Sequence, residues 1–334
     1  MKKKCTVILY NVIVVLLIFG ALEFYFEYKL SHPEDLNGRM KIASQNYYMK
    51  YGRQIIQYEP AMAMYDETLF YKLKPGIFTF KNREFNVTFK VNSLGVRDDE
   101  SSLDNPKIVV LGDSHAMGWG IEQKETFAAL LAKETQSKVL NTGISSYGTV
   151  REFQLLNQIK KDSLQYIVLQ YCDNDYPENH SYYQNGNFLN ISSKNVYDDV
   201  SSEHRSKGSY HIFKHVLKFP KLLVNANTES EVNQKMPDDE VEVFLNVIQQ
   251  ANVLNDNIKL IVFNVNGRRT TSHFIDALKL TLQDEKWKKL ATQIIPLDVS
   301  AGLTAEKYHI LDDHMNAKGH AFVASELKKL INLH

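Results

Sequence analysis

A serine that follows a short apolar run is the first residue in this sequence that could carry chemistry. Residues 107–111 form the run, and Gly112, Asp113 and Ser114 come directly after it. A serine at the carboxyl end of the first strand of a parallel sheet lies where such sheets bind ligands, and its backbone N–H can face a developing oxyanion. The alternative is that Asp113 and Ser114 only cap the next helix.

Two further candidates could donate hydrogen bonds at the same edge of the sheet. Gly143 follows the second predicted strand, and a glycine there lets a backbone N–H approach the crevice closely. Asn174 follows the third predicted strand, and its side-chain amide can donate a hydrogen bond without carrying charge, as an oxyanion hole requires. Each residue taken alone also fits an ordinary turn.

A histidine near the C-terminus is the candidate general base. His314 stands just before the last predicted helix, directly after Asp312 and Asp313. A serine hydroxyl needs a neutral imidazole to remove its proton near neutral pH, and a carboxylate can hold the other ring nitrogen. Asp312 is the preferred orienting acid and Asp313 the reserve. A surface cluster at the start of a helix is the alternative for all three residues.

The elements that must position these residues alternate between short apolar strands and amphipathic helices. This alternation is typical of a parallel sheet covered by helices on both faces. Right-handed crossovers then place the functional loops at the carboxyl ends of the strands. The sequence predicts strands at 107–111, 139–141, 166–171, 259–264 and 293–297, and helices at 126–135, 150–160, 239–254, 274–282 and 317–330.

Two segments do not follow this alternation. Residues 31–105 are polar and aromatic, and the alternating stretch 85–91 predicts a strand within a small β-rich lead-in to the main domain, residues 106–334. Residues 176–237 are rich in Tyr, Asn and Ser and too aromatic for a typical disordered linker. We interpret them as an insertion that folds over the strand ends.

The N-terminus carries a candidate membrane anchor, residues 1–30. Three lysines precede the apolar run 5–22, which as a helix would extend ~27 Å, close to the thickness of a hydrocarbon core. A cleaved signal peptide is the alternative, but residues 20–23 make a poor cleavage site and the aromatic residues 24–26 suit a membrane interface. The lysines predict that the N-terminus is inside and the catalytic domain outside the cytoplasm.

Composition excludes a disordered, a collagen-like and a polytopic membrane protein. The chain has 334 residues, of which 44% are hydrophobic and 23% charged, and these values are ordinary for a globular protein. Its 39 basic and 39 acidic residues give no net charge, so nucleic-acid binding is disfavoured. Cys5 and Cys172 lie far apart without metal-ligand spacing, so we expect neither a disulfide framework nor a zinc site, and no metal or organic cofactor.

Taken together, the four candidate sites resemble the blocks of the SGNH (GDSL-type) hydrolase superfamily of serine esterases and acyl-transfer enzymes. They occur in the family's order, between residue 107 and the C-terminus. The resemblance implies a flavodoxin-like, three-layer doubly wound α/β fold. It also implies that Ser114 is the nucleophile, His314 the base and Asp312 its orienting acid, with an oxyanion hole formed by the Ser114 and Gly143 N–H groups and the Asn174 side chain.

The chain departs from the common family pattern in two blocks. Many members have Gly-x-Asn-Asp in the third block, where this chain has Cys172 at the glycine position. The last block is commonly Asp-x-x-His, whereas Leu311 stands three residues before His314. The Asp-x-His form resembles a variant found in polysaccharide-modifying relatives. Ala116 takes the place of the last glycine of Gly-x-Ser-x-Gly, which argues against an α/β-hydrolase elbow.

The leading hypothesis is an extracytoplasmic serine esterase that hydrolyses acyl esters. The preferred acyl group is acetyl, and the ester is expected on carbohydrate or lipid of the cell envelope. The second hypothesis is an O-acyltransferase, in which a polysaccharide hydroxyl replaces water as the acceptor. A non-catalytic binding scaffold is the third. The expected partners are an acyl-ester substrate and the membrane; the sequence leaves protein partners and oligomeric state open.

Overall fold

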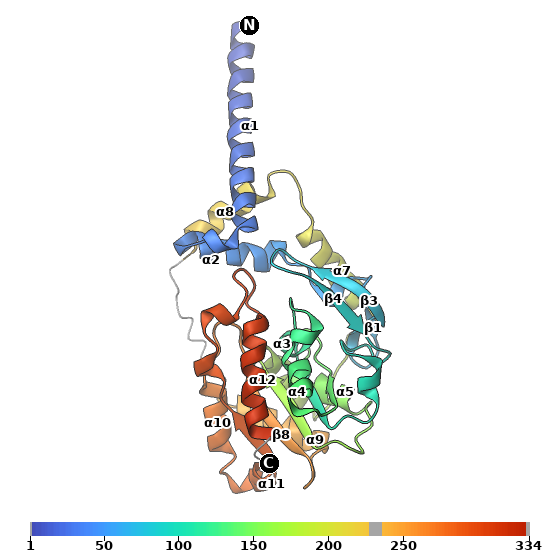
Figure 1. Cartoon of the computed structure of the whole chain (residues 1–334). Helices are drawn as coiled ribbons and strands as arrows, with labels where there is room; N and C mark the ends of the chain where they lie inside the picture. Colours follow the sequence, from blue (N-terminus) through green and yellow to red (C-terminus); the bar gives the residue numbers. More distant parts are fainter. Residues whose placement is uncertain (1, 227–235, 332–334) are drawn as a thin grey trace.

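A parallel five-stranded sheet forms the centre of the computed structural model, which describes residues 2–226 and 236–331 (Figure 1). Every pair of neighbouring strands is parallel. In chain order the strands are arranged 2-1-3-4-5, the flavodoxin-like order, which confirms the predicted doubly wound α/β fold. From one edge of the sheet to the other, the strands are β6 (Val139–Asn141), β5 (Ile108–Gly112), β7 (Tyr166–Tyr171), β8 (Lys259–Asn264) and β9 (Ile294–Leu297).

Helices cover both faces of this sheet, because successive residues of each strand point to opposite sides. Val109 and Leu111 of β5 pack in the cluster of one helical layer, and Ile108 and Val110 pack in the cluster of the other. Both clusters are fully buried, as expected for strands that read as continuous apolar runs. The first layer contains α5 (Thr149–Leu156), α9 (Glu240–Ala251) and α10 (His273–Thr281); the second contains α4 (Phe127–Thr135) and α12 (Ala317–Ile331).

The lead-in contains two small antiparallel sheets, in keeping with the predicted β-rich part. β1 (Ala63–Asp66) pairs with β2 (Phe70–Leu73), and β3 (Gly76–Lys81) pairs with β4 (Asn86–Val91). β4 alternates between exposed and buried residues, which is why its sequence pattern was recognisable.

The lead-in shares its core with the main domain. Its buried Phe80 and Phe89 pack in one cluster with Met117 and Trp119, which lie at and just after the short helix α3 (Ser114–Met117). The buried Arg97 guanidinium donates to the carbonyl oxygens of Met117, Gly118 and Ile121. The lead-in therefore supports the segment that carries the candidate nucleophile.

The described part of the predicted insertion, which omits residues 227–235, contains three helices. They are α6 (Tyr176–Gln184), α7 (Lys194–Gly208) and α8 (Lys214–Val224). Helix α7 packs on the lead-in near β1 and β2, and α8 packs on α2 (Gly38–Tyr47) and α1. Their aromatic residues fill these cores: Tyr197 packs near Tyr58, and Phe219 stacks on Tyr47. That the insertion folds over the strand ends stays a prediction.

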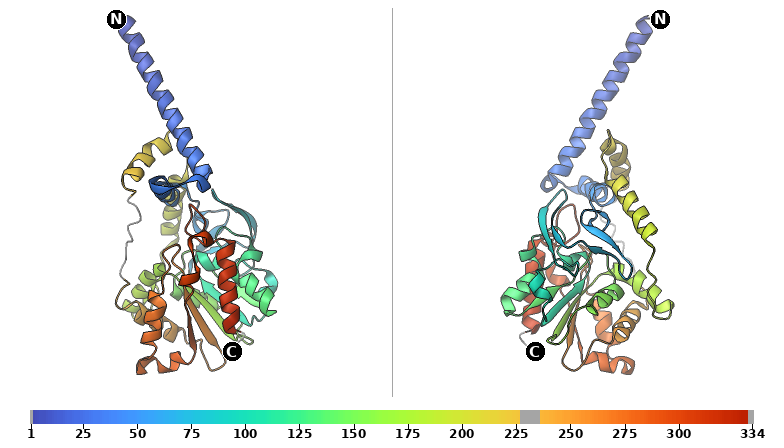
Figure 2. Two further views of the ribbon diagram at one scale, coloured as in Figure 1. Left: turned by 60° about the vertical axis from the view of Figure 1, so that its left-hand side comes forward. Right: turned by 90° about the vertical axis from the view of Figure 1, so that its right-hand side faces the viewer.

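Helix α1 (Lys2–Ser31) projects from the rest of the molecule (Figures 1 and 2). It is the one described helix that is long and apolar enough to cross a membrane, and its most apolar window is not buried anywhere in the structure. Its C-terminal end behaves differently, because Phe26 and Leu30 pack in a cluster with residues of α2 and α8. The C-terminal end of α1 is therefore part of the folded domain.

We expect Gly112→Ala to destabilise the protein, because Gly112 ends β5 with φ +147 and an added Cβ would lie 2.7 Å from the Ala116 Cβ. Such backbone strain costs about 1–3 kcal/mol before the steric contact is counted. Chemical denaturation of the full chain in detergent should show a loss of about 2 kcal/mol or more. Gly208→Ala is the matched control, since a Cβ there meets nothing within 4 Å. Equal stability of both variants would contradict the expectation.

Candidate active site

Ser114, His314 and Asp312 form one continuous chain of hydrogen bonds at the carboxyl ends of the strands. The Ser114 Oγ lies 2.6 Å from His314 Nε2, and His314 Nδ1 lies 2.5 Å from Asp312 Oδ1. Because a carboxylate only accepts, Nδ1 carries the ring proton and Nε2 is left to accept the serine proton. Ser114 and His314 are each 7% exposed, while Asp312 is fully buried. This is the arrangement of a serine nucleophile, its base and an orienting acid.

The second oxygen of Asp312 is held by two side chains from elsewhere in the chain. The Tyr48 hydroxyl donates to Oδ2 at 2.8 Å, and the Trp119 indole N–H donates to it at 3.0 Å. Burial by itself would raise the pKa of the Asp312 carboxyl, but His314, Arg53 and Tyr48 outweigh it and hold that pKa well below its usual range. Asp312 therefore stays ionised and can stabilise an imidazolium at His314.

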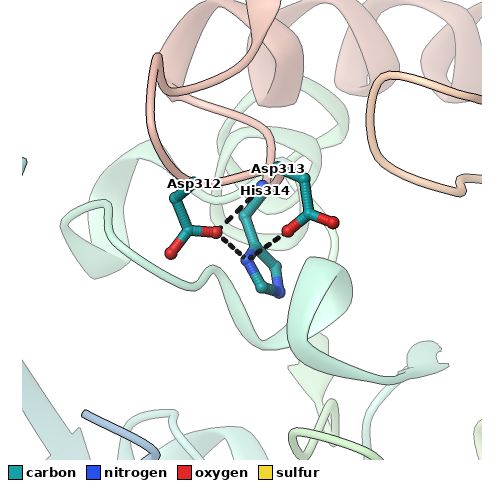
Figure 3. Close-up of side chains that lie close together, drawn as sticks. All are labelled: Asp312, Asp313 and His314. Carbon is teal, nitrogen blue, oxygen red and sulfur yellow. Dashed lines mark hydrogen bonds and ion pairs between the residues drawn. The ribbon is translucent and has the colours of Figure 1, made fainter. Parts of the chain in front are cut away.

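Asp313 lies in a different position relative to the histidine (Figure 3). Its Oδ1 is 3.7 Å from His314 Nδ1, and its side chain is 40% exposed. Asp312 is the better placed orienting acid of the two. The three residues could in principle also ligate a metal ion, since their ligand atoms lie within 4.8 Å of one another. Both ring nitrogens of His314 are, however, already engaged by Asp312 and Ser114.

The turn that presents Ser114 is fixed by a buried amide. The Oε1 of Gln170, on β7, accepts from the N–H groups of Asp113 and Ala116, both at 3.2 Å. The Asp113 side chain caps α3 by accepting from the His115 N–H. Ser114 is the first residue of α3, so its own N–H has no acceptor inside that helix. The cap role and the nucleophile role of this segment are therefore compatible.

The structure brings Gly143 and Asn174 to the same edge of the sheet as Ser114. The hydrogen-bond donors of both residues have partners within the protein. A Cβ on Gly143 would lie 2.4 Å from the Met117 nitrogen, so only glycine fits against α3. The Gly143 N–H donates to Asn141 Oδ1 at 3.0 Å. The Asn174 Nδ2 lies 3.4 Å from Asp113 Oδ2, a long hydrogen bond that a substrate could replace.

Two charged side chains hold the backbone of the loop that carries Asp312 and His314. The Glu84 carboxylate accepts from the N–H groups of residues 310–312 at 2.6–2.8 Å. Arg268 Nη2 donates to the carbonyl oxygens of His309, Ile310 and Asp312. Burial raises the pKa of Glu84, and the three backbone N–H groups oppose that rise. These contacts fix the backbone on which the base depends.

Sequence reasoning missed the supporting residues. Tyr48, Arg53 and Glu84 lie in the lead-in, more than 220 residues before the loop that they hold. Trp119 lies between two predicted elements, and Gln170 stands in a segment predicted only as a strand. No local pattern marks them. The signal that could have directed attention to Gln170 is its polar side chain within an apolar strand, because a buried amide needs partners.

Comparisons with known proteins give similarity to solved structures only. No protein-family model and no curated protein sequence matches the chain. A lipolytic protein of the G-D-S-L family from Desulfitobacterium hafniense is 12% identical with a TM-score of 0.38, over 68% of this chain and 99% of that one. A carbohydrate esterase from Talaromyces cellulolyticus, of carbohydrate esterase family 3, is 14% identical with a TM-score of 0.34, over 68% and 97%.

A third structure is that of a carbohydrate esterase whose active site has divergent catalytic and non-catalytic binding functions. It is 14% identical with a TM-score of 0.40, and this chain spans 64% of its length, less than two thirds. At such low TM-scores the functional assignment rests on the geometry around Ser114.

We expect Asp312→Asn to lower kcat for a simple aryl ester by about 10⁴-fold, because an amide cannot stabilise the imidazolium and favours the wrong tautomer of His314. Asp313→Asn is the matched control, and it should lower kcat by less than about tenfold, since its carboxylate is partly exposed and screened. Steady-state kinetics of both variants distinguish the two aspartates. The larger loss in Asp313→Asn would contradict the assignment.

Tyr48 is expected to act as a positioning residue for the triad. Tyr48→Phe removes one hydrogen bond to a buried carboxylate, worth about 1.5–3 kcal/mol, so kcat should fall about tenfold or more while KM changes little. The neighbouring Tyr51→Phe is the control, because the Tyr51 hydroxyl does not contact the triad. A change confined to KM, or an equal loss in both variants, would count against this role.

Proposed function

We propose that this chain is a serine ester hydrolase of the SGNH type, anchored by α1 with its catalytic domain outside the cytoplasm. The observation that carries the proposal is the hydrogen-bonded series from Ser114 through His314 to the buried Asp312. Each residue has an adequate structural explanation alone, but a serine facing an unprotonated ring nitrogen with an ionised acid behind the ring has the specific use of activating the hydroxyl. The lysines at residues 2–4 support the proposed orientation.

The proposed reaction passes through an acyl-enzyme. The Ser114 Oγ attacks the ester carbonyl while its proton moves to His314 Nε2, and Asp312 stabilises the resulting imidazolium. His314 then gives that proton to the leaving alcohol as the C–O bond breaks. Water next attacks the acyl-enzyme, again losing its proton to His314, and the carboxylic acid leaves as the Ser114 hydroxyl is restored.

Three donors would stabilise the tetrahedral intermediate. The Ser114 N–H is available at the start of α3, and the Gly143 N–H and the Asn174 amide are the other two candidates. The long contact of Asn174 with Asp113 would be exchanged for one with the oxyanion when substrate binds. Catalytic hydrogen bonds commonly tighten only in the complex with substrate.

The substrate we propose is an acyl ester, acetyl first, carried by carbohydrate or lipid of the cell envelope. The position of the domain beside a candidate membrane span supports a substrate at the envelope. A sugar hydroxyl that replaces water in the second half-reaction would make the same site an acyltransferase. Release of free acid in the presence and absence of a sugar acceptor separates these two outcomes.

The decisive experiment is labelling of the full chain in detergent with a fluorophosphonate, followed by mass spectrometry. We expect modification at Ser114, because only an activated serine reacts quickly, and loss of this modification in His314→Ala. Ser114→Ala should lower ester hydrolysis by at least about 10³-fold with an unchanged melting temperature. Labelling of wild-type protein that survives in His314→Ala, or no labelling of folded wild-type protein, would refute the proposed triad.

A further inference from the structure

Helix α8 presents an apolar face to the outside. Its other face, with His215, Val216 and Phe219, is buried in the protein. Leu217 and Val224 lie on the outer face and are 61% and 77% exposed, although a surface helix of a soluble domain normally has polar residues there. Ile212, just before the helix, is 74% exposed. Tyr210 and Pro220 are exposed as well, and with the three residues above they make up the apolar patch.

This patch lies beside the candidate membrane span. Phe213 packs edge to face against Phe19 with ring centroids 5.6 Å apart, and Phe19 belongs to the apolar run 5–22. About two turns farther along α1, Phe219 stacks on Phe26 with ring centroids 4.4 Å apart. In all three ribbon views, α8 lies at the end of the ectodomain from which the free length of α1 projects (Figures 1 and 2).

Polar contacts fix α8 to α1 at this level. The Glu23 carboxylate accepts from the backbone N–H groups of His215 and Val216, at 3.2 and 2.9 Å, and from the Tyr210 hydroxyl at 2.9 Å. The His215 ring also lies 2.9 Å from Glu27. An acidic side chain at the first turn of α8 suits the free N–H groups there. The depth of α8 relative to the span is therefore set by specific bonds.

We propose that residues 210–224 form an interfacial membrane contact, with the side chains of Ile212, Leu217 and Val224 among the lipids of the leaflet nearest the catalytic domain. The proposal depends on α1 spanning the membrane and goes beyond the esterase activity. A phospholipid leaflet is the occupant that continuity with α1 requires. The exposed Lys221 on the same helix can extend toward lipid phosphates, as lysines of amphipathic interfacial helices do.

This contact would orient the active site relative to the membrane. The cluster that holds α8 against α1 and α2 also contains Leu311, next to Asp312 in the catalytic loop. Gln45 of α2 donates to the Ile310 carbonyl oxygen at 2.8 Å. A lipid-bound α8 would thus hold the catalytic loop in one orientation relative to the lipid surface. Without this contact, the domain could rotate freely about its connection to α1.

Depth-dependent quenching tests the proposal on the full chain in phosphatidylcholine–phosphatidylglycerol nanodiscs. Cys5 and Cys172 are replaced by Ser, and an environment-sensitive fluorophore is attached at Leu217→Cys or Val224→Cys. Leu280→Cys is the matched control, because Leu280 is equally exposed but lies on α10, away from α1. Lipids brominated in the upper acyl chain should quench the first two probes at least twofold and leave the third unchanged.

Equal quenching at all three positions would overturn the proposal. So would probes at residues 217 and 224 that are shielded from aqueous iodide yet insensitive to brominated lipid, since that result would indicate a second protein chain on the patch. Repeating the measurement with Ser114→Ala should give the same quenching. The outcome therefore does not depend on whether the chain is an esterase.

Discussion

The buried negative charge of Asp312 is the constraint on which the rest of the site depends. An ionised carboxylate without access to water is tolerated only if it is paired and hydrogen-bonded on both oxygens. His314 comes from the same loop, but Trp119 follows α3 and Tyr48 lies beyond α2. Three distant parts of the chain must therefore meet at one carboxylate, and the fold outside the sheet is arranged accordingly.

This requirement explains why the lead-in is packed against the main domain. Phe80 and Phe89 of its small sheets place Trp119, and Arg97 holds the carbonyl oxygens of the turn that follows α3. Glu84 at the tip of the β3–β4 hairpin then fixes the loop that bears Asp312. The parallel sheet supplies the position of Ser114, and the lead-in helps to fix the loop whose His314 lies within hydrogen-bond distance of it.

The parts of the structure that could be predicted are those determined by local pattern. Continuous apolar runs mark β5, β7 and β8, because both of their faces are buried, and Ser114 was found since it directly follows such a run. Tyr48 and Arg53 could not be found, because their role depends on contacts over more than 250 residues of sequence. The aromatic content of residues 176–237 indicated a packed segment but did not specify which core it enters.

The same dependence extends to the end of the molecule from which α1 projects. Tyr48 packs in the cluster that joins α1, α2 and α8, and its hydroxyl bonds the triad acid. Phe26 and Leu30 of α1 also lie in that core, so the C-terminal end of this helix is a packed part of the domain. The residues that fix α1 to the domain thus share a cluster with Tyr48, which bonds Asp312, so α1 and the candidate active site belong to a single packed unit.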